Sequence, residues 1–240
     1  MRRAWFGLLA MLVGALALAA ACGGGGEKAA PTPATLPQAD EVLPKVVERV
    51  AALKSFHFRL EHENGLTPIP FDLKLKTAEG DVQVPDRMQA KLEADVAGAL
   101  LRVEVIGIGE EGWMTNPFSH EWQALPAGTS ISAIFDPAAG IQAVARSLQE
   151  VRVAGVEKVG GDNTYLLEGQ VDSGVLEAAA PIAEPGLTVN VKVWVGVDDY
   201  NIRQVRLEGP FAPGEPENIV RILYLSKFDE PVSIEPPTQP

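Results

Sequence analysis

Three histidines and one cysteine are the side chains of this 240-residue sequence best suited to metal binding or catalysis. His57 falls on the polar face of an alternating segment, where a solvated role is expected, and His62 lies close to a turn. His120 stands in a short loop beside Trp122. Their spacing matches no metal-ligand pattern, and no G-x-S-x-G or other nucleophile motif accompanies them. The sequence therefore predicts no catalytic residue, no metal site and no cofactor, and we expect no enzyme.

Paired acids and two tryptophans are the remaining residues whose types suggest chemistry. Glu110–Glu111 and Asp198–Asp199 both fall between alternating segments, so we expect turn or solvated roles rather than an acid–base pair. Trp113 and Trp122 leave two interpretations open. They pack in the core of a hairpin, or they form an aromatic wall of an apolar pocket.

Cys22, the single cysteine, is predicted to be an attachment point for lipid. Two arginines give the chain a positive start, and the 17 residues 5–21 carry no charge and end in three alanines. A positive region, an apolar region and small residues before a cleavage point are typical of a secretory signal. A lone cysteine in an exported protein forms no internal disulfide. Leu18–Cys22 is similar to the lipobox of bacterial lipoproteins, although Ala19 stands where leucine is usual.

Three terminal segments flank the predicted domain. Residues 1–21 are interpreted as a lipoprotein signal peptide, residues 22–37 as a Gly/Pro-rich tether, and residues 231–240 as a Pro-rich C-terminal tail. Two other interpretations of residues 5–21 stay open: ordinary secretion, or an uncleaved membrane span, for which the run is slightly short. With lipidation, we expect the protein to be exported and lipid-anchored to the outer face of the cytoplasmic membrane, in the cell envelope.

The charge balance excludes two classes of partner. The 20 basic and 32 acidic residues give a formal net charge of −12, and removal of residues 1–21, which hold two arginines and no acid, makes it −14. So acidic a chain, without a basic stripe, is a poor match for nucleic acid or for anionic lipid headgroups. Membrane contact is therefore expected through lipid on Cys22. Residues 38–230 suffice for one globular domain.

Two helices are predicted from apolar residues at three- and four-residue intervals. The first covers residues 39–54, with Pro44 expected in its first turn. Its apolar stripe is Leu43, Val46, Val47, Val50 and Leu53. The second starts at Asp136–Pro137, a capping acid before a proline at the first helical position. Its stripe is Ile141, Val144, Ala145 and Leu148, and a short helical piece is expected over residues 173–180.

Alternation of apolar and polar residues predicts the strands. In residues 55–63, for example, Phe56, Phe58 and Leu60 share one face. The predicted strands are 55–63, 71–76, 88–96, a segment around 101–105, 112–116, 122–125, 151–159, 163–171, 187–197, 202–208 and 219–226. Gly160–Asp162 is a hairpin signal between two of them.

These elements predict one α+β domain, with a large antiparallel sheet of about nine or ten strands and two main helices. A sheet of this size curls, because its strands twist, and so offers a concave apolar face. Helices that cover this face only partly leave an internal apolar cavity, whereas helices that fill it leave a solid interior. The sequence permits both.

The order of several short motifs is similar to that of the LppX/LprAFG lipoprotein family. The most telling are the start of the second helix, Asp136–Gly140, the strand segment Thr164–Gly169 and the ending Pro231–Pro236. They follow the lipobox, the tether, a helix that leads into Ser55–Phe58, and a hairpin that holds Trp113. The resemblance covers about residues 38–237.

This resemblance implies a strongly curved antiparallel half-barrel, with helices packed on its concave face around an apolar cavity, related to the LolA/LolB lipoprotein-localisation fold. It also implies a ligand: an acylated lipid or glycolipid that is held in the cavity and carried or presented in the cell envelope. A membrane transporter is a candidate partner. The family offers no cluster of catalytic residues to transfer.

The predicted cavity lining comes from both kinds of element. It consists of Phe56, Phe58, Phe71, Leu73, Leu75, Leu92, Val103 and Val105 on strands and Val47, Val50, Ile141, Val144 and Leu148 on helices. The alternative function is that of a non-catalytic structural or accessory envelope lipoprotein that acts through a protein partner on its acidic surface. A cavity of roughly several hundred Å³ favours the carrier, and a solid interior favours the accessory role.

Overall fold

The folded part of the chain is a 12-stranded antiparallel sheet with two α-helices. The computed structural model describes residues 36–69, 73–126, 131, 136–178, 180, 182–212 and 214–238. Cys22, the predicted signal peptide and the tether as far as residue 35 lie outside these residues. The elements are α1 Ala39–Ala51, β1 Ser55–Glu63, β2 Thr67–Ile69, β3 Leu73–Gln83, β4 Arg87–Val96, β5 Ala99–Ile108, β6 Glu111–Thr115, β7 Trp122–Ala124, α2 Pro137–Ser147, β8 Gln149–Val159, β9 Asp162–Asp172, the 3₁₀ helix η1 Ser173–Ala178, β10 Thr188–Gly196, β11 Ile202–Glu208 and β12 Val220–Ser226.

Hairpin connections build most of the sheet, and one long-range pairing joins its halves. The strand order is β7-β6-β5-β4-β3-β1-β12-β11-β10-β9-β8, with short β2 paired beside β3. β1 pairs with β12, from His57 opposite Ser226 to Glu63 opposite Val220. In the described residues β7 and β8 are the two edges, so the sheet is open. The predicted antiparallel sheet and its two helices are confirmed, but the described sheet has 12 strands and not about nine or ten, and the domain is mostly β.

Strand β3 is longer than its sequence pattern predicts. Residues 71–76 were expected to form it, but it continues to Gln83, and a register shift against β4 lies between Leu75 and Thr77. Such a bulge inserts one extra residue and exchanges the faces of the positions that follow. Leu75 is therefore buried before the bulge, and Ala78 and Val82 after it. The strict alternation that marks a strand in the sequence breaks at this point.

Helix α1 buries a slightly different stripe from the predicted one. Its buried residues are Val42, Val46 and Val50, which lie four residues apart. Pro44 is the sixth residue of the helix, not in the first turn as predicted. It is exposed, so water can satisfy the backbone carbonyl that the proline leaves without an N–H donor.

Helix α2 starts as its sequence predicts. Asp136 is the N-cap, and its Oδ1 accepts a hydrogen bond from the Ala139 N–H at 2.9 Å, while Pro137 occupies the first helical position. This satisfies one of the N–H groups that a helix start leaves without a partner. Ile141 and Val144 on the same helix are buried.

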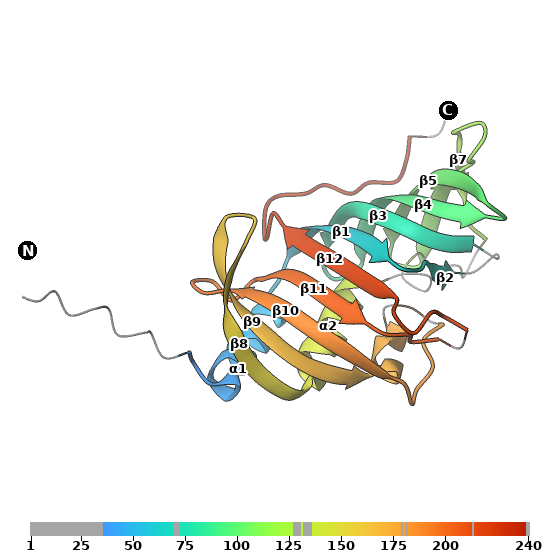
Figure 1. Ribbon diagram of the computed structural model, residues 1–240. Helices are drawn as coiled ribbons and strands as arrows, with labels where there is room; N and C mark the ends of the chain where they lie inside the picture. The colour runs from blue at the N-terminus through green and yellow to red at the C-terminus, as the bar shows by residue number, and fades with distance from the viewer. Residues whose placement is uncertain are drawn as a thin grey trace, which may run out of the picture. The chain divides into compact units, whose positions relative to one another are not determined.

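Both helices lie on one face of the sheet (Figure 1). One apolar cluster joins Val50 of α1 and Ile141 of α2 to Phe58 of β1 and Val193 of β10. The core therefore lies between the helices and the sheet, and it spans both halves of the sheet.

The C-terminal segment after β12 is fastened to the domain. Asp229 Oδ1 accepts from the Lys54 N–H at 2.8 Å, and the Ser55 hydroxyl donates to the Glu230 carbonyl at 2.6 Å. Ile234 is only 1% exposed, and its carbonyl accepts from Arg87. Residues 231–238 carry no regular secondary structure, yet they pack on the domain as far as Ile234.

Gly80 tests how closely β3 and β4 pack. A Cβ added there would lie 2.0 Å from the Gln89 carbonyl oxygen and 2.7 Å from Ala90 Cα, both backbone atoms. We expect Gly80→Ala to lower the free energy of unfolding by about 2–3 kcal/mol, as overpacking does. Gly155→Ala is the matched control, because a Cβ there meets nothing within 4 Å. Urea unfolding followed by tryptophan fluorescence measures both, and similar midpoints would refute the close approach.

Candidate functional site

An apolar cavity lies between helix α2 and the middle of the sheet. Its volume is about 90 Å³. The described residues that line it are Leu60, Thr67, Ile69, Leu75, Pro137, Gly140, Ile141, Val144, Leu176, Ala180, Val205, Leu207, Phe211, Arg221 and Leu223. α2 and η1 supply one wall, and β1, β2, β3, β11 and β12 supply the other. The cavity thus draws on both halves of the sheet.

The predicted lining residues that the structure describes fall into four groups. Leu75, Ile141 and Val144 line the cavity. Other members are buried in the surrounding core without lining the cavity, namely Phe56, Phe58, Val50, Val105 and Leu148. Leu92 and Val103 pack partly buried against that core, whereas Leu73 and Val47 are half-buried and lie outside it. Phe71 lies outside the described residues.

Sequence reasoning missed the C-terminal wall of the cavity. Val205, Leu207 and Leu223 line it from β11 and β12. Their alternation within predicted strands was a usable signal for a buried face. The missing information was the position of β12 beside β1, which local sequence does not carry.

One buried ion pair closes an end of this cavity. The side chains of Arg221 and Glu215 are 4% and 2% exposed and pair directly. Arg221 Nε also donates to Thr67 Oγ1 at 2.7 Å, and its guanidinium stacks 3.5 Å from the centre of the Phe211 ring. Burial lowers the pKa of Arg221 to about 10, and the Glu215 carboxylate opposes that effect, so the guanidinium stays charged near neutral pH.

His62 stands behind this polar end and is neutral. Its Nδ1 lies 2.8 Å from the Lys76 carbonyl oxygen, and its Nε2 lies 2.7 Å from Thr67 Oγ1. Burial lowers its pKa to about 4. Nδ1–H therefore donates to the carbonyl, and Nε2 accepts the Thr67 hydroxyl proton. The sequence indicated only that His62 lies near a turn.

The other residues considered for chemistry lie away from the cavity. His57 is on the polar face, as predicted, and contacts Asp81 at 2.8 Å and Glu79 at 3.3 Å. Register places Trp113 opposite Ile106 and Trp122 opposite Thr115. Both tryptophans are half-buried, and neither belongs to the described lining of this cavity, so they form no aromatic wall of it. Their packing within the hairpin stays a prediction.

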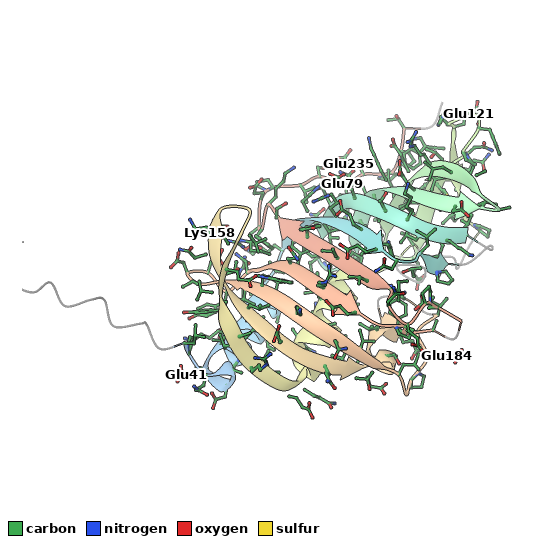
Figure 2. All side chains as sticks on the ribbon, in the orientation of Figure 1. Glu41, Glu79, Glu121, Lys158, Glu184 and Glu235 are labelled. Atoms are coloured by element: carbon green, nitrogen blue, oxygen red, sulfur yellow. The ribbon has the colours of Figure 1, made fainter. Side chains whose placement is uncertain are left out.

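The paired acids lie at strand turns, as predicted. Glu110 is in the turn between β5 and β6 and Glu111 begins β6, while Asp198 and Asp199 lie between β10 and β11. Asp199 accepts hydrogen bonds from Asn201 and Arg203. Figure 2 shows labelled acidic side chains such as Glu79 projecting outward from the domain, in keeping with the strongly negative chain.

Neither described helix has the length and hydropathy needed to cross a bilayer. Within the same part of the chain, no three His, Cys, Asp or Glu side chains gather into a group suited to a metal ion.

Comparison with known proteins gives consistent matches. The sequence profile of the LppX_LprAFG lipoprotein family matches residues 38–234. The lipoarabinomannan carrier proteins LprG of Mycobacterium tuberculosis and Mycobacterium bovis are 23% identical over 235 residues, covering 96% of this chain and 94% of those proteins. Among solved structures, LprF from M. bovis superposes with a TM-score of 0.65 at 17% identity, over 82% of this chain and 95% of LprF. LppX from M. tuberculosis gives 0.58 at 17% identity, over 82% and 100%.

The neutral state of the half-buried His62 side chain predicts a pH-dependent stability. Its pKa is 6.5 when unperturbed and about 4 in the fold, so between these values the unfolded chain binds more protons. The free energy of unfolding therefore falls as the pH is lowered through this window. We expect His62→Gln to flatten that decline in urea unfolding from about pH 7 to about pH 4.5. His120→Gln, at an exposed position, is the control; parallel curves for wild type and His62→Gln would contradict the assignment.

Proposed function

The chain belongs to the LppX_LprAFG lipoprotein family, and from this membership we propose that it carries or presents an acylated lipid or glycolipid in the cell envelope. The observation that carries the proposal is the apolar cavity beneath α2. Its described lining is hydrocarbon apart from Arg221 and Thr67, so it suits an acyl chain and offers nothing for bond-breaking chemistry.

The relatives supply the ligand class. LprG is a lipoarabinomannan carrier by name, and lipoarabinomannan is a glycolipid. At 23% identity we take over the class, an acylated glycolipid or lipid, and not the particular molecule. A membrane transporter that delivers or receives this lipid is the protein partner we propose.

The size of the cavity requires movement for a lipid to enter. Its volume of about 90 Å³ is well below the roughly 300–1,000 Å³ of common ligand pockets. We propose that α2 moves away from the sheet. The sheet then encloses the acyl chain of the lipid as a strongly curved half-barrel with the helices on its concave face. Each buried methylene contributes about 0.8 kcal/mol towards the cost of opening.

A second candidate is a structural or accessory envelope lipoprotein that acts through a protein partner. The small cavity is the observation that favours it, since a nearly filled interior has no room for a full acyl chain without rearrangement. Its acidic surface would then be the functional part of the domain.

Cavity filling distinguishes the two candidates. Val144 lines the cavity and is 5% exposed, so Val144→Phe places a ring in the space that an acyl chain would take. We expect native mass spectrometry of wild type from its own host to show bound lipid. Val144→Phe should co-purify with at least about tenfold less lipid. Val151→Phe is the control, because Val151 packs partly buried against the core and is not among the described lining residues. Wild type without co-purified lipid, and without uptake of added lipid, would favour the accessory role.

Membrane attachment is proposed to depend on Cys22. Cys22→Ser removes the thiol that would take diacylglycerol, and residues 38–234 should fold as before. We expect the variant to move from the membrane to the soluble fraction, measured by fractionation and immunoblotting, with unchanged circular dichroism. Retention in the membrane would show instead that residues 5–21 anchor the chain as a span.

A further inference from the structure

The cavity has one polar end, and this end is unusual in an otherwise apolar lining. Among the described residues that line it, Arg221 is the only charged side chain, and Thr67 is the only other one with a polar group. Burying an ion pair costs desolvation free energy that an apolar pair of similar volume would avoid. The placement of Arg221 against the cavity therefore calls for an explanation beyond packing.

The hydrogen bonds of Arg221 leave part of the guanidinium unused. A guanidinium has five N–H donors. Nε donates to Thr67 Oγ1, Nη1 to the Gly209 carbonyl at 3.3 Å, and Nη2 to Glu215 Oε1. Two N–H groups remain, and no acceptor for them exists in the described part of the chain.

The neighbouring groups have no donor left for a ligand. The Thr67 hydroxyl gives its proton to His62 Nε2. Glu215 uses Oε1 for Arg221 and Oε2 for the backbone N–H groups of Phe211 and Ala212, at 3.0 and 3.3 Å. What this end can offer a bound molecule is thus a pair of N–H donors on a cationic group.

We propose that Arg221 binds the hydrogen-bond-accepting oxygen of the lipid, an ester carbonyl or a carboxylate at the head of the acyl chain. The inference rests on the proposed function and adds to it the chemical class of headgroup. Arg221 then sets the orientation of the ligand: the oxygen lies by the guanidinium, and the hydrocarbon runs along Leu60, Ile141 and Val144. Headgroups that only donate hydrogen bonds find no partner there.

A purely architectural role for the pair makes a different prediction. Arg221 and Glu215 also hold the segment between β11 and β12, because Glu215 caps the backbone at Phe211 and Ala212. If that were their whole role, loss of Arg221 would weaken the binding of every ligand alike. If Arg221 instead recognises an acceptor oxygen, its loss weakens the binding of ligands that carry such an oxygen and spares the others.

Three probes with the same chain length separate these cases. Palmitate is an anionic acceptor, methyl palmitate a neutral acceptor, and hexadecylammonium a headgroup that only donates. Their dissociation constants are measured by competition with a fluorescent fatty acid on the delipidated, purified protein. We expect both acceptors to bind at least about tenfold more tightly than hexadecylammonium, as charge-assisted hydrogen bonds imply.

Two variants and a control complete the test. The double variant Arg221→Met with Glu215→Gln leaves no unpaired buried charge, and we expect it to lose the preference for acceptors. Glu215→Gln alone removes the carboxylate that competes for Arg221, so it should lower the dissociation constant of palmitate several-fold. Arg206→Met, on the neighbouring strand and paired with Glu63 and Glu208, should change nothing.

The possible outcomes are distinct. An equal loss of affinity for all three probes in the double variant would overturn the role of Arg221 and leave the carrier function standing. So would a wild type that shows no preference for acceptor headgroups. Failure of wild type to bind any probe overturns the carrier function and this inference with it. Selective loss of palmitate and methyl palmitate supports both.

Discussion

The pairing of β1 with β12 is the interaction on which the rest of the fold depends. It joins residues 57–63 to residues 220–226 across more than 150 positions of sequence, and each half of the sheet is otherwise built by local pairings. Without it, the domain would consist of two sheets, each with an unpaired edge and an exposed apolar face. The cavity depends on it too, because Leu60 comes from β1 and Leu223 from β12.

Contacts at the end of this pairing explain where the domain stops. Ser55 begins β1, and its hydroxyl and carbonyl bond to Glu230 and Asp229 just after β12. Arg49 of α1 forms an ion pair with Asp229 at 2.5 Å, so the first helix, first strand and C-terminal segment are held together. These contacts at residues 229 and 230 keep the following segment close to the domain. Ile234 therefore packs against the domain although its segment is rich in proline.

What could be predicted from sequence follows the range of the interactions involved. Asp136–Pro137 and the alternation of residues 55–63 are local signals, and both elements begin where expected. The bulge at residue 76 of β3 and the choice of Val42 over Leu43 on α1 depend on the neighbours that each element packs against. Arg221 was beyond local reading, because Ile222 on the opposite face of β12 is also buried, so hydrophobicity alone does not say which face is interior.

The two walls of the cavity differ in how readily they can part. On the Arg221 side, the ion pair with Glu215 and the bond to Thr67 are directional, and separating them would leave buried polar groups unpaired. On the α2 side, Ile141 and Val144 meet the sheet through apolar contacts, which are non-directional. Methylenes of an acyl chain replace such contacts with others of the same kind. Opening for a lipid therefore costs least along α2, while the polar end stays in place and fixes the direction in which the chain enters.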